Sequence, residues 1–311
     1  MIYNNDPASI VKGGLFDVVM FDCDGVLYQS NSVLKGAIET VHALRENNVH
    51  VKFITNSSTK SREKMFEKLS NLGFKSISVN DCFPSGYCTG EYLRTSTSAK
   101  RVYVIGESGL VEELRRAGLE VIGGPDDNDK CMTDALFIKY GDSDEFSNVD
   151  AVIVGYDQRI NYYKIAVASL CFQQNKECRL IATNPDRHDR IGGKWLIPVN
   201  GCGLAAVTQA VNGLDHQEGT VEPVVLGKPN ALFGNLVLQV SRLGHVPPER
   251  VLMVGDKIDT DIALAKNCGF KSCLVLSGCC TREEIGRYEN PSSVADFVLD
   301  GLCDIADALE K

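Results

Sequence analysis

The stretch LFDVVMFDCDGV, residues 15–26, indicates the fold of this chain more clearly than any other segment. Its first seven residues are rich in Val and Phe, which is typical of a buried β-strand. Asp22 and Asp24 follow directly, at the carboxyl end of that strand. Because open α/β sheets bind ligands at the carboxyl ends of their strands, the two aspartates are candidates for a functional site.

Strand and helix patterns alternate outward from this segment. A helical pattern over 35–47 precedes a strand over 49–54, and a second helix ends at Gly73. The same order returns late in the chain, where strands are predicted at 224–226, 251–254, 271–276 and 297–299. An alternating order of this kind predicts parallel strands, so the expected fold class is α/β, with a Rossmann-like doubly wound parallel sheet.

A second α/β stretch separates the two halves of this pattern. Strands are predicted at 101–105, 135–138, 151–154 and 179–182, and helices at 109–117 and 163–174. The sequence therefore predicts a core domain formed by 1–96 and 221–311, with an inserted α/β cap domain at 97–220.

The composition excludes several classes of protein. The chain has 32 basic and 41 acidic residues, and its net charge of −9 argues against nucleic-acid binding and against adhesion to an anionic membrane. No apolar run approaches the roughly 20 residues of a membrane span, and residues 1–14 do not resemble a secretory signal. The 12 cysteines are scattered, without a Cys-x-x-Cys pair, which favours reduced thiols in a cytoplasmic protein over disulfides or zinc ligands.

Asp22 and Asp24 are two residues apart and could approach one centre. One carboxylate could attack phosphorus and form an aspartyl-phosphate, while the other protonates the leaving oxygen and later activates water. The alternative interpretation is a turn at Asp24-Gly25 with Asp22 as a helix cap.

Other polar groups also follow predicted strands. Thr55 and Asn56 could hold phosphoryl oxygens, or they could cap the next helix, as could Ser57. Lys228 could neutralise a phosphoryl group, or it could be a solvated surface lysine.

The segment GDKIDTD, residues 255–261, carries three further carboxylates. A strand end followed by a helix start can present such groups to Mg²⁺, which prefers oxygen ligands. The alternative is acidic enrichment at a helix N-terminus, and we accept it for Asp259. For Asp256 we expect a metal site, because parallel strands would place it beside Asp22.

In order along the chain, these segments resemble the motifs of the haloacid dehalogenase-like phosphatases: Asp22-Cys23-Asp24-Gly25-Val26, Thr55-Asn56, Gly227-Lys228-Pro229 and Gly255-Asp256 with Thr260-Asp261. The insertion between the second and third motifs resembles the branch with a large α/β cap of the second type. That branch includes 4-nitrophenylphosphatases, phosphoglycolate phosphatases and pyridoxal phosphatases. The resemblance extends over nearly the whole chain.

The resemblance implies a role for each matching position. Asp22 would be the nucleophile and a Mg²⁺ ligand, and Asp24 would be the acid/base, with its backbone carbonyl on the metal. Lys228 would neutralise the phosphoryl group. Asp256 would bind Mg²⁺ directly, and Asp261 would hold Lys228 or a metal-bound water.

The substrate-binding residues are expected to come from two places. Thr55 and Asn56 would bind the phosphoryl group, and Ser57 and Asn184 are predicted to contribute. The polar segment Asn184–Arg190 is either a specificity loop or an exposed loop, and Tyr156 is a weaker candidate of the same kind. Cys23 is expected to be a packed thiol.

The resulting prediction is a Mg²⁺-dependent phosphomonoesterase acting on a small phosphorylated metabolite. Its substrate is predicted to be 2-phosphoglycolate, with 4-nitrophenyl phosphate as a surrogate and pyridoxal 5′-phosphate as the alternative. Two other classes are a phosphotransferase or mutase and a non-catalytic phosphometabolite-binding protein. The resemblance also implies a homodimer formed through the cap.

Overall fold

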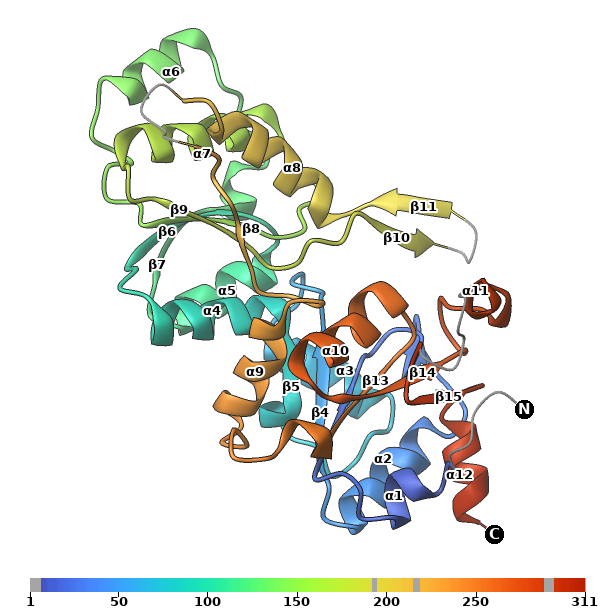
Figure 1. Ribbon diagram of the computed structural model, residues 1–311. Helices are drawn as coiled ribbons and strands as arrows, with labels where there is room; N and C mark the ends of the chain where they lie inside the picture. The colour runs from blue at the N-terminus through green and yellow to red at the C-terminus, as the bar shows by residue number, and fades with distance from the viewer. Residues whose placement is uncertain (1–6, 192–194, 215–218, 288–293, 311) are drawn as a thin grey trace. The chain divides into compact units, whose positions relative to one another are not determined.

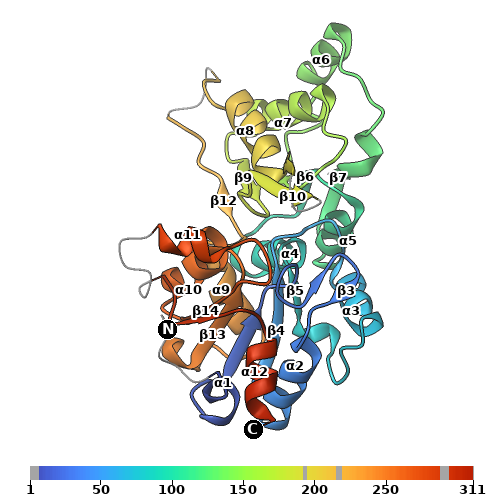
Figure 2. The same cartoon turned by 90° about the vertical axis from the view of Figure 1, so that its right-hand side faces the viewer.

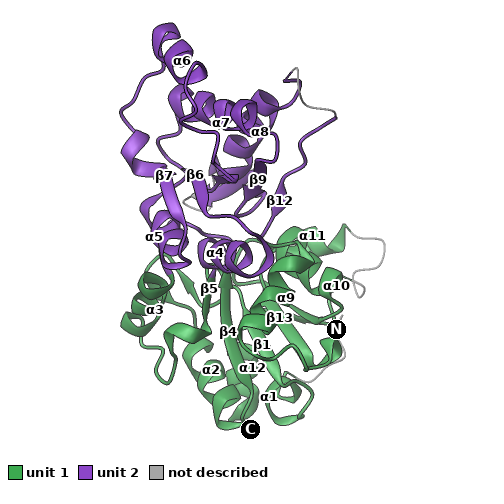
Figure 3. Ribbon diagram, turned by 90° about the vertical axis from the view of Figure 1, so that its left-hand side faces the viewer, with its two compact units in different colours: residues 1–55, 62–83, 228–311 green, residues 56–61, 84–227 purple. Residues whose placement is uncertain are grey.

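The computed structural model of the chain describes residues 7–191, 195–214, 219–287 and 294–310. The chain forms two compact units, coloured separately in Figure 3. Unit 1 comprises residues 1–55, 62–83 and 228–311, and unit 2 comprises residues 56–61 and 84–227. Each unit is built on a sheet of parallel strands flanked by helices, so the predicted fold class is confirmed.

Unit 1 contains a six-stranded sheet in the order β15-β14-β13-β1-β4-β5. Its strands are β1 (Val18–Phe21), β4 (His50–Thr55), β5 (Cys82–Pro84), β13 (Val251–Gly255), β14 (Lys271–Val275) and β15 (Phe297–Leu299). Strand β1 lies in the interior of the sheet and pairs in parallel with β4 and β13. All four of its residues are buried, as the continuous apolar run predicts for a strand covered on both faces.

The register of these three strands determines which residues meet at the sheet edge. Phe21 lies opposite Phe53 of β4 and opposite Val254 of β13. Asp22 therefore leaves β1 between the ends of its two neighbours: β4 ends at Thr55, and β13 ends just before Asp256.

Helices cover both faces of the unit 1 sheet (Figure 1). One face packs against α1 (Ser9–Lys12), α2 (Ala37–Glu46), α3 (Arg62–Asn71) and α12 (Cys303–Leu309). Figure 2 shows α12, near the C-terminal end, beside α2. The second face is covered by α9 (Ala231–Val240) and α10 (Ala263–Cys268), which pack against each other, and α11 (Arg282–Gly286) joins a smaller apolar cluster. Short turns lie at Val79–Asp81, Pro248–Arg250 and Ile258–Ile262, and the strands β2 (Tyr28–Gln29) and β3 (Ser32–Val33) form a hairpin.

Unit 2 contains a five-stranded parallel sheet in the order β12-β9-β8-β6-β7. The strands are β6 (Arg101–Ile105), β7 (Glu120–Gly123), β8 (Ala151–Val154), β9 (Arg179–Ala182) and β12 (Val224–Val225). Helices α4 (Ser85–Ser96) and α5 (Ser108–Arg116) pack together, and α7 (Tyr162–Gln174) and α8 (Asn200–Val211) pack together on the opposite face (Figure 1). A short turn at Gly124–Asp127 follows β7.

Two segments of unit 2 differ from the predictions. The predicted strand at 135–138 is wrong, because these residues lie in helix α6 (Asp134–Gly141), whose N-cap Thr133 accepts a hydrogen bond from the backbone of Leu136. A four-residue apolar run does not distinguish a strand from a helix, and the N-cap at Thr133 favours the helix. The last three residues of the polar segment Asn184–Arg190, predicted as a loop, lie instead in β10 (His188–Ile191), which pairs antiparallel with β11 (Trp195–Pro198).

The division into units also departs from the predicted domain boundaries. Strand β12 pairs with β9 of unit 2, although the predicted strand at 224–226 was assigned to the core domain. Residues 56–61 and helix α4 likewise group with unit 2 by contacts. Apolar periodicity predicts a strand but carries no information about its partner, so these assignments depend on the tertiary structure. Among the described residues, no helix is both long and apolar enough to cross a membrane.

Candidate active site

The carboxyl ends of β1 and β13 bring two aspartates together in unit 1. The backbone amide of Asp22 donates to the carbonyl of Val254 at 2.9 Å, which continues the parallel ladder by one residue. Asp256 follows β13 at the adjacent position and is 1% exposed, while Asp22 is 8% exposed. The predicted proximity of these two residues is confirmed.

Lys228 reaches the same cluster from a segment that lies 206 residues after Asp22 in sequence. Its Nζ donates to Oδ1 of Asp22 at 2.7 Å and to Oδ1 of Asp261 at 2.6 Å. The side chain is buried rather than solvated. Burial by itself would lower the pKa of Lys228, but the carboxylates of Asp22 and Asp261 raise it above its usual value. The ammonium group is therefore held in its charged form beside Asp22.

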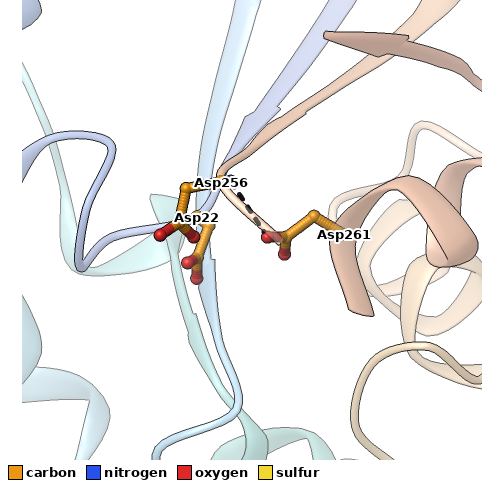
Figure 4. Close-up of side chains that lie close together, drawn as sticks. All are labelled: Asp22, Asp256 and Asp261. Carbon is orange, nitrogen blue, oxygen red and sulfur yellow. Dashed lines mark hydrogen bonds between the residues drawn. The ribbon is translucent and has the colours of Figure 1, made fainter. Parts of the chain in front are cut away.

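Three carboxylates face one another at this point, as Figure 4 shows. Asp22, Asp256 and Asp261 each offer an oxygen, and these oxygens all lie within 4.8 Å of one another. Oδ2 of Asp256 accepts from the backbone amide of Cys279 at 2.7 Å. Its Oδ1, by contrast, is buried without a hydrogen-bond partner. A buried carboxylate oxygen without a donor is costly unless a cation binds it, so the cluster fits a hard divalent ion.

Asp261 has a supporting position within the cluster. Its Oδ2 accepts from the backbone amides of Asp256 at 3.2 Å and Lys257 at 3.0 Å, and the first of these bonds is drawn in Figure 4. Its other oxygen binds Lys228. Both oxygens are thus engaged within the protein, which agrees with the predicted role of holding Lys228 in place.

The electrostatics of the cluster favour binding of a cation. Burial and the nearby charge of Asp22 raise the pKa of Asp256 above its usual value. Burial also raises the pKa of Asp261 to about 7; the Lys228 ammonium opposes this increase, and the carboxylates of Asp22 and Asp256 add to it. One ammonium group does not balance three carboxylates, so a divalent cation would relieve their repulsion.

Two glycines allow the surrounding backbone to approach Asp256. Gly25 has a φ of +81°, and a Cβ there would collide with Oδ2 of Asp256. A Cβ at Gly278 would collide with the same oxygen. The segment 277–280 was not among the sequence-predicted site residues, although Ser277-Gly278 directly after the predicted strand 271–276 was an available signal.

Asp24, the predicted acid/base, lies in the turn that follows β1 and is exposed. The turn is closed by hydrogen bonds from Gly25 N to Tyr28 O at 2.8 Å and from Leu27 N to Cys23 O at 2.9 Å. Its side chain is not part of the carboxylate cluster. A ligand role through the backbone carbonyl of Asp24 stays a prediction.

The predicted phosphoryl-binding residues fall into both units. Thr55 ends β4 in unit 1 and is half-buried. Asn56 groups with unit 2, where its Nδ2 donates to both carboxylate oxygens of Asp186 at 3.0 Å. Ser57 is exposed, and its hydroxyl lies 3.1 Å from that of Thr59.

Asn184 is buried in unit 2 and connects neighbouring segments there. Its Nδ2 donates to the carbonyl of Asn56 at 2.8 Å, and its Oδ1 accepts from the backbone amide of Asp186 at 3.1 Å. These bonds give Asn184 a structural function, and substrate binding by this residue stays a prediction.

Two residues outside the site agree with their predicted interpretations. Asp259 is exposed. Cys23 is fully buried, its Sγ lies 3.7 Å from the carbonyl of Ile54, and burial raises its pKa well above the usual range. A protonated, packed thiol is not a reactive one.

Comparisons with known sequences identify relatives of both halves of the chain. The haloacid dehalogenase-like hydrolase family matches residues 19–120, and a family described as HAD-hydrolase-like matches residues 225–305. The chain is 36% identical to phosphoglycolate phosphatase 2 of Arabidopsis thaliana over 267 residues, covering 84% of this chain and 83% of the relative. It is 33% identical to glycerol-3-phosphate phosphatase of Homo sapiens over 312 residues, covering 94% and 91%.

A solved structure agrees with these relationships. The 4-nitrophenylphosphatase of Thermotoga maritima matches with a TM-score of 0.75 and 27% sequence identity. The match covers 94% of this chain and 97% of that protein.

Proposed function

Because this chain belongs to the haloacid dehalogenase-like hydrolases and is a phosphoric monoester hydrolase, we propose that it is a Mg²⁺-dependent phosphatase of a small metabolite, 2-phosphoglycolate. The observation that carries this proposal is the arrangement around Asp22. One of its oxygens binds the Lys228 ammonium at 2.7 Å, and the unpartnered Oδ1 of Asp256 lies in the same carboxylate cluster.

The arrangement supports hydrolysis in two steps. In the first step, a carboxylate oxygen of Asp22 attacks phosphorus, the bond from phosphorus to the ester oxygen breaks, and Asp24 gives its proton to that oxygen. In the second step, Asp24 takes a proton from water, whose oxygen attacks phosphorus and releases Asp22 and inorganic phosphate. Lys228 is positioned to stabilise negative charge on the phosphoryl oxygens in both steps.

A Mg²⁺ ion would be held by Asp22 and Asp256, with the backbone carbonyl of Asp24 as a further ligand. It would neutralise charge between the anionic nucleophile and the phosphate. Asp261 would take part through Lys228, since both of its oxygens already accept hydrogen bonds.

The choice of substrate is supported by named relatives. The similarity of this chain to phosphoglycolate phosphatase 2 of Arabidopsis thaliana supports 2-phosphoglycolate as its substrate. The similarity to glycerol-3-phosphate phosphatase of Homo sapiens, which is 33% identical over 94% of this chain, supports glycerol 3-phosphate as the second candidate substrate. Thr55, Asn56 and Ser57 are the proposed phosphoryl-binding residues, and pyridoxal 5′-phosphate remains a prediction from the sequence resemblance.

The test is a comparison of kcat/KM for 2-phosphoglycolate, glycerol 3-phosphate and pyridoxal 5′-phosphate, each with Mg²⁺ and with a chelator. We expect 2-phosphoglycolate to give the highest value and the chelator to abolish turnover. Release of inorganic phosphate distinguishes hydrolysis from transfer to another acceptor.

Asp22→Asn should lower kcat by about 10⁴-fold or more while the protein stays folded. Asp259→Asn is the matched control, because this exposed carboxylate lies in the same segment as Asp256 and Asp261. Equal activity of Asp22→Asn and wild-type protein would refute the proposed nucleophile. A higher kcat/KM for either of the other two esters would refute the proposed substrate and leave the chemistry intact.

The oligomeric state is a separate proposal. We propose a homodimer formed through unit 2, and light scattering after size-exclusion chromatography measures it directly.

A further inference from the structure

The turn that carries Asp24 is joined to helix α3 by a cation–π contact. Nζ of Lys68 lies 3.6 Å from the centroid of the Tyr28 ring. Tyr28 is 5% exposed and belongs to the same apolar cluster as Met65 and Leu69 of α3. An ammonium group at this distance from a buried ring is attracted by the negative face of its π-system.

The backbone of Tyr28 is hydrogen-bonded to the two residues that flank Asp24. Its carbonyl accepts from the amide of Gly25 at 2.8 Å, and its amide donates to the carbonyl of Cys23 at 3.3 Å. Asp24 and Tyr28 also form an isolated β-bridge. A shift of Tyr28 would therefore change the backbone that directs the Asp24 carboxyl group.

The opposite side of this turn is held by other contacts. Oγ of Ser277 donates to the carbonyl of Gly25 at 2.8 Å, and Gly25 itself lies against Asp256. Thus the turn is fixed to the carboxylate cluster on one side and to α3, through the Lys68–Tyr28 contact, on the other.

We propose that Lys68 is a positioning residue, which holds the Tyr28 ring and through it the turn that directs the Asp24 carboxyl group toward the leaving oxygen of the substrate. This inference rests on the proposed role of Asp24 as the acid. It gives α3, which contributes no residue to the carboxylate cluster, an influence on proton transfer.

The test uses the dependence of the reaction on its leaving group. 4-Nitrophenolate leaves without receiving a proton, whereas an alkoxide such as that of 2-phosphoglycolate needs the acid. The measured quantity is kcat/KM, because it reports the steps up to the first bond cleavage. Loss of Lys68 should therefore lower kcat/KM for 2-phosphoglycolate at least ten-fold more than for 4-nitrophenyl phosphate.

Four variants make the comparison specific. Lys68→Met should produce the leaving-group effect, and Lys68→Arg should retain most of the wild-type ratio, because a guanidinium also stacks on aromatic rings. Tyr28→Phe keeps the ring and should resemble wild type, while Tyr28→Leu should resemble Lys68→Met. Lys64→Met is the matched control, since Lys64 is exposed one turn earlier on α3.

The outcomes separate this inference from the proposed function. Asp24→Asn is measured in the same assay; if it shows no leaving-group effect, the proposed acid role of Asp24 fails. If Asp24→Asn shows the effect and Lys68→Met lowers both substrates equally, the inference about Lys68 is overturned and the acid role stands. A rise in KM alone would also overturn the inference, because it would indicate direct substrate contact by Lys68. Should Lys68→Met not fold, Lys68→Gln supplies the same comparison.

Discussion

Each unit contains a buried lysine with a carboxylate partner, and the two lysines have different surroundings. In unit 1, Lys228 binds Asp22 and Asp261 and lies in a cluster of three carboxylates. In unit 2, Nζ of Lys164 donates to Asp157 at 2.5 Å and to Oδ1 of Asn128 at 2.6 Å. The Lys164 site pairs one cation with one anion and a neutral amide, whereas the Lys228 site has an excess of negative charge.

The proposed function assigns cation and phosphoryl binding to the Lys228 site, and the charge balance of the Lys164 site fits a structural role. The Lys164 side chain is 0% exposed and that of Asp157 is 3% exposed, so the pair is complete within the protein. The Lys228 site contains a buried oxygen of Asp256 without a donor and two carboxyl groups whose pKa values are raised by burial and by neighbouring carboxylates. Burial of a lysine therefore does not distinguish the two sites. The excess of carboxylates at the strand ends of unit 1, with one oxygen lacking a donor, is what supports cation binding there.

Among the variants that test this comparison of the two lysines, the largest expected effect comes from removing Lys228. Lys228→Met should lower kcat/KM by about 10³-fold, because the developing charge on the phosphoryl oxygens loses its fixed cation. Steady-state kinetics with 2-phosphoglycolate measures this change. The exposed Lys266 of α10 provides the control variant Lys266→Met, which should retain wild-type activity. Equal losses of kcat/KM in both variants would contradict a catalytic role for Lys228.

Lys164→Met should act on stability instead. It leaves Asp157 buried without its cation, which we expect to lower the free energy of unfolding by about 3–5 kcal/mol. Urea denaturation measures the loss, and folded protein should keep kcat/KM within a few-fold of wild type. Lys176→Met, an exposed change just after α7, is the control. If Lys164→Met had wild-type stability and reduced activity, the structural role inferred for Lys164 from its charge balance would be wrong.

Magnesium should stabilise the protein through unit 1. At a concentration 100 times the dissociation constant, Mg²⁺ is expected to add about 2.7 kcal/mol to the free energy of unfolding. Thermal denaturation with and without Mg²⁺ measures the increase. Asp256→Asn should abolish it and Asp259→Asn should not. Stabilisation that survives Asp256→Asn would place the ion elsewhere.

The smallest expected effect is a pH dependence of stability in the metal-free protein. Burial and the charge of Asp22 raise the pKa of Asp256, so the folded protein retains a proton that the unfolded chain has already lost. The stability of the metal-free protein should therefore fall as the pH rises from the usual carboxyl pKa of about 4 through the raised pKa of Asp256. Asp256→Asn should reduce this slope in urea denaturation at a series of pH values, and an unchanged slope would contradict the prediction.

Asp81, also in unit 1, should change stability with pH in the opposite direction, because its pKa is lowered. Burial acts to raise its pKa, but Lys52 at 2.9 Å and Arg45 at 2.7 Å outweigh that effect and lower it. Its contribution to stability should be present above pH 4 and be lost as pH falls through its lowered pKa. Asp81→Asn should therefore remove stability at neutral pH and flatten the acid limb of the stability curve.

The sequence predicted the elements that carry the unit 1 cluster because each signal was local and strong. The apolar run before Asp22 and the run before Asp256 are fully buried strands, as expected. The predictions failed where local signals were short or incomplete. The run at 135–138 is helical, and the strand at 224–225 joins the sheet of unit 2.

The pairings between remote segments of the site had no local signal, even where a turn signal such as Ser277-Gly278 marked one of the two segments. The amide of Cys279 that fixes Asp256 lies 23 residues away from it in sequence, and the contact of Lys68 with Tyr28 spans 40 residues. Such pairings depend on how the elements pack, and neither residue type nor spacing encodes them.

The sequence alone determined the α/β class, the parallel orientation of the unit 1 strands and the acidic and basic residues at their carboxyl ends. These features follow from the alternation of apolar runs and helical periods, which is a local property of the chain. Only the tertiary structure decided which carboxylate oxygens are paired, which one is left without a donor and which pKa values burial raises. Those properties arise from distances between segments remote in sequence and from the exclusion of water around them.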